Sequence, residues 1–242
     1  MAIYEEVVSN AGHRALVLGV TPEIVSMRWP AGTELLALDR SAGMIEHVWP
    51  RKGLVARSDW LKLALPDASR DVVIGDNPFT RHRYPDGHRA MLASIRRVLA
   101  PRGLLVLRYF CRAEADETPG RVFGELREGK IGNFHIFKWR LAMALQPGVS
   151  EGVAWGAVWD AWNAAVRDPE AVVRGLGWKP EVLRTIEVNR GSTDRVTFPT
   201  LAELKAVLEE RFEVVRLVIP DYEMGERCPI VVARPRQPFS VA

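Results

Sequence analysis

Short apolar runs that end at a glycine or a carboxylate recur along the first half of the chain. Residues 15–19, 34–39 and 71–75 form three such runs, each with the length and apolar character of a buried strand. Residues 86–100 instead carry apolar side chains at the spacing of one helix face. Strands that alternate with helices predict an α/β fold, in which a doubly wound, mostly parallel sheet has helices on both faces.

Further elements complete this pattern on either side of a long interruption. Serine and threonine before the expected helices suit N-cap positions, and proline suits the first turn. A Pro-Arg-Gly turn at 101–103 ends the helix at 86–100, and the tail after Pro235 is expected to fray. The remaining strands are expected at 54–56, 104–109, 212–219 and 229–234, and the remaining helices at 22–29, 42–48 and 201–211, with Thr21, Ser41 and Thr200 as their N-caps.

The interruption, residues 111–198, follows the fifth strand and shows no clear pair of strands. It is too long to be an unstructured connection in a compact domain. We therefore expect a single domain, residues 1–242, in which 111–198 form a helical cap over an acceptor pocket. The helices of this cap are expected at 120–127, 133–145 and 153–174, the last broken near Pro169.

A stripe of three tryptophans and a valine, Trp155, Trp159, Trp162 and Val166, lies at helical spacing within this segment. Such a stripe usually packs into a core, which is the interpretation we favour. The alternative is a wall of a substrate pocket, because aromatic walls suit apolar or planar acceptors.

Charge and cysteine content narrow the class of protein. A net charge of +3 gives little attraction to nucleic acid or membranes, and no apolar run reaches the roughly 20 residues of a membrane helix. Two cysteines, Cys111 and Cys228, cannot form a disulfide framework, and the lack of a C-x-x-C motif argues against a zinc site of that kind. Residues 1–10 show no signal-peptide pattern. We expect a cytoplasmic protein without a metal, whose partner is a small molecule rather than nucleic acid.

Ligands of open α/β sheets bind at the carboxyl ends of the strands, so the residues after each predicted strand form the candidate site. A glycine there lets a ligand approach the backbone, and the helix start that follows offers free N–H groups. A carboxylate there can accept hydrogen bonds from both hydroxyls of a ribose. The candidate cofactor-binding residues are Gly19, Val20 and Thr21 after the first strand, Asp39 and Arg40 after the second, Ser58, Asp59 and Trp60 after the third, and Asp76 and Asn77 after the fourth.

The order of these pieces resembles the class I S-adenosylmethionine-dependent methyltransferase family, over residues 12–110 and again over 196–234. Residues 97–107 resemble the helix, Leu-x-Pro-Gly-Gly turn and fifth strand of that family, with Arg102 in place of the first glycine of the turn. The stretches at 18–23 and 132–139 are similar to a bacterial subgroup of unknown substrate.

This resemblance implies a seven-stranded sheet whose last strand is antiparallel and lies between the fifth and sixth. It also implies S-adenosylmethionine as the cofactor, with its ribose on Asp39 and its adenine against Asp59 and Trp60. The reaction would be direct methyl transfer to a small-molecule acceptor, for which no metal is required and alignment of the reacting atoms matters most. The acceptor and the oligomeric state are left open.

The first loop departs from the family pattern, which reads acidic-x-Gly-x-Gly-x-Gly. Val17 stands at the acidic position, Thr21 and Glu23 replace the second and third glycines, and only Gly19 remains. This departure supports the alternative of a non-catalytic binding or regulatory module on the same fold. A nicotinamide-dependent oxidoreductase is disfavoured, because no G-x-G-x-x-G follows the first strand.

Structural roles compete with several of the functional ones. Asp39 could simply end a strand, and Trp60 could belong to the core. The stretch 76–79, Asp-Asn-Pro-Phe, partly resembles a motif of methyltransferases that act on nucleobase amino groups, but a proline turn explains it better. His135 is the weak candidate for a catalytic proton acceptor, although a lone histidine on a helix is more often structural.

Overall fold

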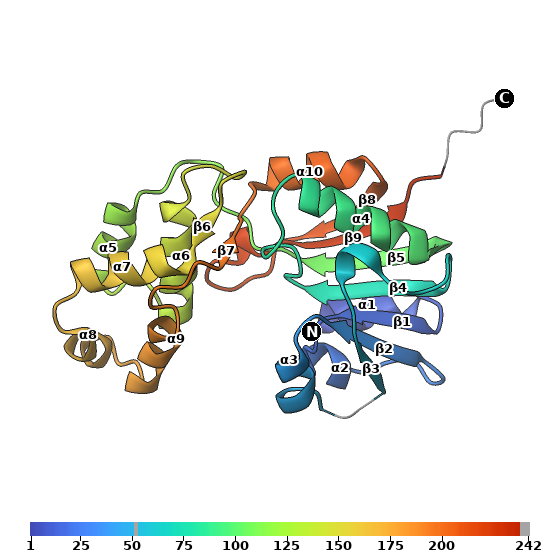
Figure 1. Ribbon diagram of the computed structural model, residues 1–242, viewed down its shortest axis with the longest axis horizontal. Helices are drawn as coiled ribbons and strands as arrows, with labels where there is room; N and C mark the ends of the chain where they lie inside the picture. The colour runs from blue at the N-terminus through green and yellow to red at the C-terminus, as the bar shows by residue number, and fades with distance from the viewer. Residues whose placement is uncertain (51–52, 238–242) are drawn as a thin grey trace.

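A single seven-stranded sheet forms the centre of one half of the molecule (Figure 1). The computed structural model describes residues 1–50 and 53–237 of the chain. The strands are β1 (Arg14–Leu18), β2 (Glu34–Asp39), β3 (Leu54–Arg57), β4 (Arg70–Asp76), β5 (Leu99–Arg108), β8 (Phe212–Val218) and β9 (Ile230–Pro235).

The strand order is β3-β2-β1-β4-β5-β9-β8. The first five strands in this order pair in parallel, whereas β9 pairs antiparallel with both β5 and β8. The predicted mostly parallel sheet is therefore confirmed, and so is the antiparallel last strand between the fifth and sixth strands of the sheet.

Helices cover both faces of the sheet, as a doubly wound fold requires. On one face α1 and α2 pack apolar side chains such as Tyr4 and Ile24 against inward-facing strand residues such as Val17. On the other face α4 and α10 pack against strand residues such as Leu16 and Leu105. The helices are α1 (Ala2–Ser9), α2 (Pro22–Ser26) and α3 (Ala42–His47) on the first face, and α4 (Asp86–Val98), α10 (Leu201–Glu209) and the short 3-10 helix η1 (Trp60–Lys62) on the second.

Two of the three predicted N-caps are confirmed. The hydroxyl of Ser41 accepts a hydrogen bond from the Met44 N–H at 3.2 Å, and Thr200 forms a capping box with Glu203. Thr21 occupies the N-cap position of α2, but its side chain makes no capping hydrogen bond. The helix is also shorter than predicted, because the backbone becomes extended directly after Ser26.

Other boundaries differ from the prediction for identifiable reasons. The turn residues at 101–103 do not separate helix from strand; β5 starts at Leu99 and includes them, with a register irregularity opposite Arg70 and Val72. The helix α1 was not predicted. Of the tail expected to fray, residues 238–242 lie outside the described residues.

Residues 111–198 fold into helices that lie beyond the carboxyl ends of the parallel strands, beside the sheet half of the molecule (Figure 1). The predicted helical insertion after the fifth strand is confirmed. The expectation of no strand pair is wrong, because a short antiparallel pair forms between β6 and β7. The elements are α5 (Pro119–Arg127), α6 (Phe134–Leu145), β6 (Val153–Ala154), α7 (Trp155–Ala165), α8 (Pro169–Gly175), the 3-10 helix η2 (Pro180–Leu183), α9 (Arg184–Glu187) and β7 (Arg195–Val196).

The expected break near Pro169 separates two helices. The chain leaves helical conformation after Ala165, and α8 starts at Pro169, with the Asp168 carboxylate accepting a hydrogen bond from the Ala171 N–H at 2.9 Å. Across the described ranges, 1–50 and 53–237, no helix has the length and apolar character needed to cross a membrane.

The helical segment has a hydrophobic cluster of its own, and the tryptophan stripe contributes to it. Trp162 is fully buried, with ring centroids 5.3 Å from Phe134 and 5.2 Å from Phe137. Trp155 is buried, and the partly buried Trp159 packs against the same cluster. Core packing is thus confirmed as the role of the stripe.

Candidate functional site

The loop after β1 requires a glycine for its backbone conformation. Gly19 has φ of +101°, a region that residues with a side chain rarely adopt. A Cβ atom there would stand 3.7 Å from the Thr21 hydroxyl and 3.8 Å from the Asp39 carboxylate, which are ordinary contacts. The glycine is therefore needed for the turn itself, and the space above it stays open to a ligand.

Asp39, at the end of β2, links the loop after β1 to the loop after β2. One oxygen of its buried carboxylate accepts a hydrogen bond from the Val20 N–H at 3.0 Å, and the other accepts one from the Ser41 N–H at 2.8 Å. Each carboxylate oxygen has a second lone pair that these bonds do not use. Asp39 can therefore hold the two loops together and still accept hydrogen bonds from a ligand.

A recess of about 490 Å³ opens beside Asp39, and we call it the Asp39 recess. The indole N–H of Trp60 donates to the Leu38 carbonyl at 2.8 Å, which fixes the ring at the edge of the recess while its other side packs against the core. Trp60 can therefore belong to the core and still present one side to a ligand in the recess. The residues that line the recess are Asp39, Arg40, Ser41, Met44, Trp60 and Arg81.

Ser58 and Asp59 lie next to this recess but do not line it. The Ser58 N–H donates to the Asp39 carbonyl at 2.9 Å, and the exposed Asp59 carboxylate caps η1 through the Leu61 N–H at 3.0 Å. The adenine contact expected of Asp59 stays a prediction.

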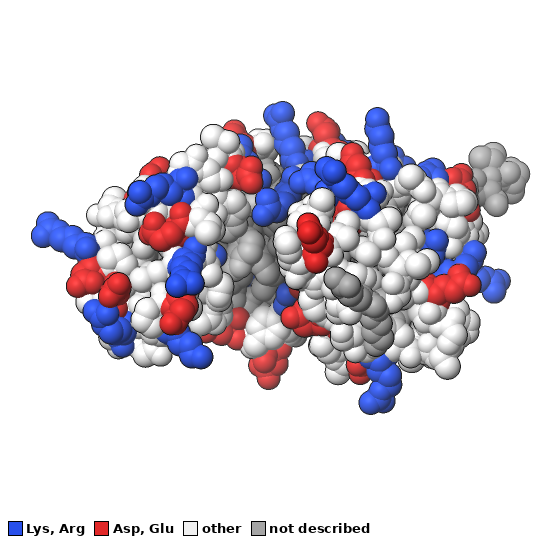
Figure 2. Space-filling model, turned by 60° about the horizontal axis from the view of Figure 1, so that its bottom comes forward, with Lys and Arg blue, Asp and Glu red and all other residues white. Residues whose placement is uncertain are grey.

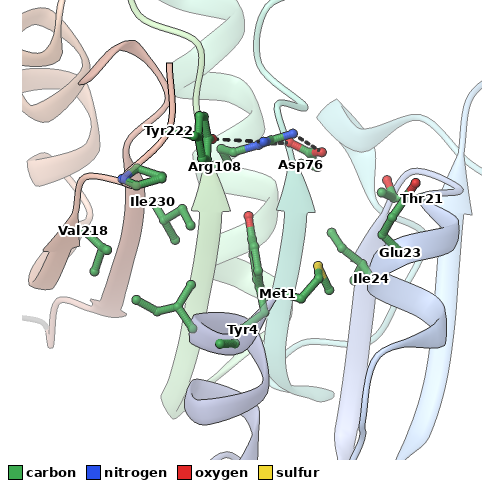
Figure 3. Close-up of a pocket in the computed structure, with 13 residues that line it drawn as sticks. Met1, Tyr4, Thr21, Glu23, Ile24, Asp76, Arg108, Val218, Tyr222 and Ile230 are labelled. Carbon is green, nitrogen blue, oxygen red and sulfur yellow. Dashed lines mark hydrogen bonds and ion pairs between the residues drawn. The ribbon is translucent and has the colours of Figure 1, made fainter. Parts of the chain in front are cut away.

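Asp76, at the end of β4, forms a two-point ion pair with Arg108, at the end of β5 (Figure 3). Arg108 Nε donates to Asp76 Oδ1 at 2.6 Å, and Nη2 donates to Oδ2 at 2.7 Å. Arg108 Nη1 also contacts the Tyr222 hydroxyl at 3.2 Å. Burial acts to lower the pKa of Arg108, but its hydrogen bonds to Asp76 outweigh burial and raise the pKa. The guanidinium therefore stays charged.

Asn77 follows with φ of +51°, a left-handed conformation that asparagine tolerates better than most residues. Its side-chain oxygen is buried and has no hydrogen-bond partner among residues 1–50 and 53–237.

A second and larger cavity, of about 570 Å³, lies between α1, the loop after β1 and the β8–β9 hairpin, and we call it the α1 cavity. The polar groups of Tyr4, Thr21, Glu23, Asp76, Arg108 and Tyr222 face it, among apolar walls. It lies near the Asp39 recess, because Thr21 of the α1 cavity and Asp39 of the recess both lie within 3.8 Å of the Cβ position of Gly19. Together the two span the carboxyl ends of β2, β1 and β4.

Sequence reasoning missed three residues of this arrangement. Arg108 ends the fifth strand, so inspection of that strand end would have found it. Tyr4 and Tyr222 lie on an unpredicted helix and on a hairpin loop, where no strand end marks them. His135 is exposed on α6 and lines neither the Asp39 recess nor the α1 cavity.

Comparison with known families explains this geometry. Residues 16–107, from β1 into β5, match the family model described as a methyltransferase domain. This part of the chain is therefore a methyltransferase domain, and its sheet has the strand order of the class I fold. A methyltransferase domain of this kind implies S-adenosylmethionine as the cofactor, and the edge of the sheet fits it. The open turn at Gly19 and the spare lone pairs of the buried Asp39 carboxylate provide a close backbone approach and an acceptor for ribose hydroxyls.

Solved structures share the fold of this methyltransferase at low sequence identity. A Rhodobacter sphaeroides protein assigned as a Zn-dependent alcohol dehydrogenase is 13% identical, with a TM-score of 0.59 over 98% of this chain and 91% of that one. The PH0226 protein from Pyrococcus horikoshii OT3 is 15% identical, with a TM-score of 0.52 over 97% and 87%. The Burkholderia thailandensis 1,6-didemethyltoxoflavin-N1-methyltransferase is 15% identical, with a TM-score of 0.51 over 98% and 76%.

Likeness at this level of identity shows the fold alone. No three His, Cys, Asp or Glu side chains gather as metal ligands within the part of the chain that the structure describes. No curated protein sequence matches the chain significantly.

Proposed function

We propose that this methyltransferase acts on a small-molecule acceptor, with its donor lying across the carboxyl ends of β2, β1 and β4. The observation that carries the proposal is the bond between the Asp39 carboxylate and the Val20 N–H at 3.0 Å. It ties the first loop to the end of β2, between the α1 cavity and the Asp39 recess. S-adenosylmethionine supplies, when bound, a methyl group on a positively charged sulfur.

Each part of the edge has a role in holding this donor. Asp39 accepts hydrogen bonds from the ribose hydroxyls, and Trp60 offers an aromatic surface to the adenine in the Asp39 recess. The sulfonium end points toward Thr21 and the α1 cavity. The carboxylates of Glu23 and Asp76 line that cavity and offer negative charge to the sulfonium.

The size of the α1 cavity supports a small acceptor. Its volume of about 570 Å³ lies within the roughly 300–1,000 Å³ of typical small-molecule sites. The net charge of +3 on the whole chain provides little attraction to a nucleic acid acceptor.

We further propose that residues 111–198 cap the donor. A recess between the two halves of the molecule is lined from the sheet side by Arg81, His82 and Arg83, and from the helical segment by Glu151 and Arg195. Arg81 also lines the Asp39 recess, so the segment borders the donor site. Figure 2 shows a hollow between the halves, with side chains of both charges around its rim. Closure of this hollow would exclude water from the donor.

Calorimetry with S-adenosylhomocysteine tests the donor site. Asp39→Ala is expected to weaken binding tenfold or more, since hydrogen bonds to charged groups contribute about 1.5–3 kcal/mol. The same substitution also loosens the first loop, so a second comparison is needed. Analogues that lack one ribose hydroxyl should bind less tightly than the parent compound to the unaltered protein, and equally tightly to Asp39→Ala.

Two outcomes contradict the proposal. If the penalty for the missing hydroxyl persists in Asp39→Ala, Asp39 does not bind the ribose. If S-adenosylhomocysteine does not bind the unaltered protein, the non-catalytic module becomes the better explanation of the glycine-poor first loop.

A further inference from the structure

The hydroxyl of Tyr4 is a buried donor without an acceptor. The residue is 5% exposed, and its hydroxyl has no hydrogen-bond partner in the described part of the chain. In Figure 3 the ring rises from α1 with its hydroxyl pointing toward the ion pair of Asp76 and Arg108. Burial, and then the charge of Asp76, raise the pKa of Tyr4, so the hydroxyl keeps its proton and remains a donor. A buried donor left unpaired costs stability, and a ligand that accepts its hydrogen bond removes that cost.

Asp76 presents the complementary group to the same cavity. Each of its oxygens already accepts one hydrogen bond from Arg108, and each has a further lone pair. The ion pair fixes the carboxylate in place, because both contacts come from one planar guanidinium. Among the polar groups that face the α1 cavity, Tyr4 therefore offers a donor that lacks an acceptor, and Asp76 offers a fixed acceptor.

Few chemical groups can accept a hydrogen bond from Tyr4 and donate one to Asp76 at the same time. A neutral hydroxyl can accept from Tyr4 and donate to Asp76. A carbonyl or a carboxylate cannot donate to Asp76, and a protonated amine has no lone pair with which to accept from Tyr4. A hydroxyl is also a nucleophile that the cationic donor can methylate once its proton leaves.

The walls of the α1 cavity indicate what the rest of the acceptor molecule is like. Apart from the polar groups at its floor and at the loop after β1, the α1 cavity is lined by aliphatic side chains and aromatic rings. Such walls favour an apolar ring system over a sugar or a peptide. The apolar wall residues include Ile3, Ile24, Val218, Pro220 and Ile230.

We propose, building on the proposed function, that the acceptor is an apolar ring compound with a phenolic or enolic hydroxyl, which Tyr4 and Asp76 orient for methylation on oxygen. The hydroxyl oxygen forms a bond to the methyl carbon, and the carbon–sulfur bond breaks with its electron pair left on sulfur. The hydroxyl proton passes to the Asp76 carboxylate and then to water. The products are a methyl ether, S-adenosylhomocysteine and one proton.

The test measures binding of phenol, catechol and naphthol by calorimetry in the presence of saturating S-adenosylhomocysteine, each beside the same ring without its hydroxyl. Methyl ether formation from the same compounds with S-adenosylmethionine is the second readout. At least one hydroxyl compound should bind more tightly than its bare ring and be methylated on oxygen. In Tyr4→Phe its affinity should fall about tenfold, while the bare ring and S-adenosylhomocysteine bind as before.

Two further variants separate this role from a structural one. Asp76→Asn keeps the shape of the side chain and should slow ether formation more than it weakens binding of the hydroxyl compound. Tyr84→Phe is the matched control, because the Tyr84 hydroxyl donates to the Glu203 carbonyl at 3.1 Å outside the α1 cavity. That variant should bind the hydroxyl compound, the bare ring and S-adenosylhomocysteine as tightly as the unaltered protein does. Tyr4→Phe should also melt at or above the temperature of the unaltered protein, since it removes an unpaired buried hydroxyl.

The outcomes are distinguishable. If S-adenosylhomocysteine fails to bind the unaltered protein, the proposed function fails and this inference fails with it. If S-adenosylhomocysteine binds but no hydroxyl compound binds more tightly than its bare ring, the donor site stands and the acceptor assignment is overturned. The same holds if Tyr4→Phe binds the hydroxyl compounds as tightly as the unaltered protein does.

Discussion

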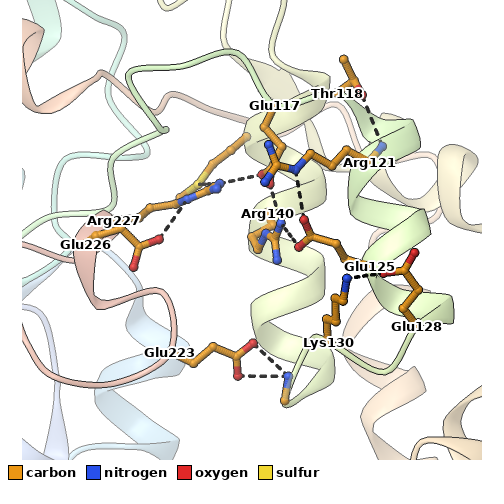
Figure 4. A network of polar contacts seen from close by, with 12 residues as sticks. Glu117, Thr118, Arg121, Glu125, Glu128, Lys130, Arg140, Glu223, Glu226 and Arg227 are labelled. Atoms are coloured by element: carbon orange, nitrogen blue, oxygen red, sulfur yellow. Dashed lines mark hydrogen bonds and ion pairs between the residues drawn. The ribbon is translucent and has the colours of Figure 1, made fainter.

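Glu117 and Arg227 form a buried ion pair, 2.7 Å from Oε2 to Nη1, that joins the helical segment to the β8–β9 loop (Figure 4). The other carboxylate oxygen of Glu117 accepts a hydrogen bond from Arg140 on α6. The same loop carries Glu223, whose carboxylate accepts from the Gly132 N–H at 2.9 Å, and Tyr222, which contacts Arg108 at the edge of the sheet. One loop thus touches both the helical segment and the α1 cavity.

Replacing Glu117 should therefore weaken the attachment of the helical segment. Its side chain is only 7% exposed, and removing one partner of a buried pair typically costs about 3–5 kcal/mol. Glu117→Ala is expected to lower the free energy of unfolding, measured by urea denaturation, by about that amount. Glu128→Ala is the control, because Glu128 pairs with Lys130 on the exposed surface and should cost at most about 1 kcal/mol. Equal losses of unfolding free energy in the two variants would show that the buried pair stabilises the protein no more than the exposed one.

The same carboxylate should make stability depend on acid. Burial acts to raise the pKa of Glu117, but the hydrogen bonds from Arg227 and Arg140 outweigh it and lower the pKa. A lowered pKa in the folded state contributes stability above the unfolded value of about 4.3. That contribution disappears as pH falls through the folded pKa. Urea denaturation from pH 7 to pH 3 should show a gap between the unaltered protein and Glu117→Gln that narrows below about pH 4. A gap of constant size over this range would contradict the assignment.

Gly19→Ala tests whether the first loop needs its positive φ. A Cβ atom would meet only ordinary contacts, so the expected cost comes from the backbone and amounts to at least about 1–2 kcal/mol. Affinity for S-adenosylhomocysteine should fall as well, because the turn carries the Val20 N–H that Asp39 holds. Gly124→Ala is the control: this glycine lies inside α5 with open space around it, and alanine there should stabilise by about 0.5–1 kcal/mol. A Gly19→Ala protein of unchanged stability and affinity would show that the loop can adopt another conformation.

The fold was predictable from the sequence because its strands mark their own ends. Buried parallel strands read as short apolar runs, and Gly19 and Asp39 stand where two of them stop. The turn residues at 101–103 misled the prediction of where β5 begins, because a turn-like sequence can also form an irregular strand opposite Arg70. The helix α1 escaped notice because its buried residues, Tyr4, Val7 and Val8, make a short stripe without a capping signal.

The site was only half predictable for a different reason. The proposed donor side depends on strand ends, which are local features of the sequence. The proposed acceptor side depends on tertiary contacts, such as the one that brings Tyr222 to Arg108 across 114 positions of the chain. Nothing in the spacing of Tyr4 indicates that its hydroxyl would be buried without a partner. Arg227 likewise looks like a surface residue in the sequence, although its side chain is largely buried and pairs with Glu117.

The helical segment should respond to the donor if it serves as a cap. Glu151 and Arg195 line the recess that adjoins the Asp39 recess through Arg81, so hydrogen exchange at 150–152 and 194–197 should slow when S-adenosylhomocysteine binds. Residues 180–187 line neither recess and provide the internal control, since their exchange should not change. Arg81→Ala should reduce the slowing at 150–152 more than it reduces donor affinity, because it removes the side chain that the two recesses share. Protection confined to the loop after β1, with no change at 150–152 or 194–197 under saturating ligand, would show that the segment does not close over the donor.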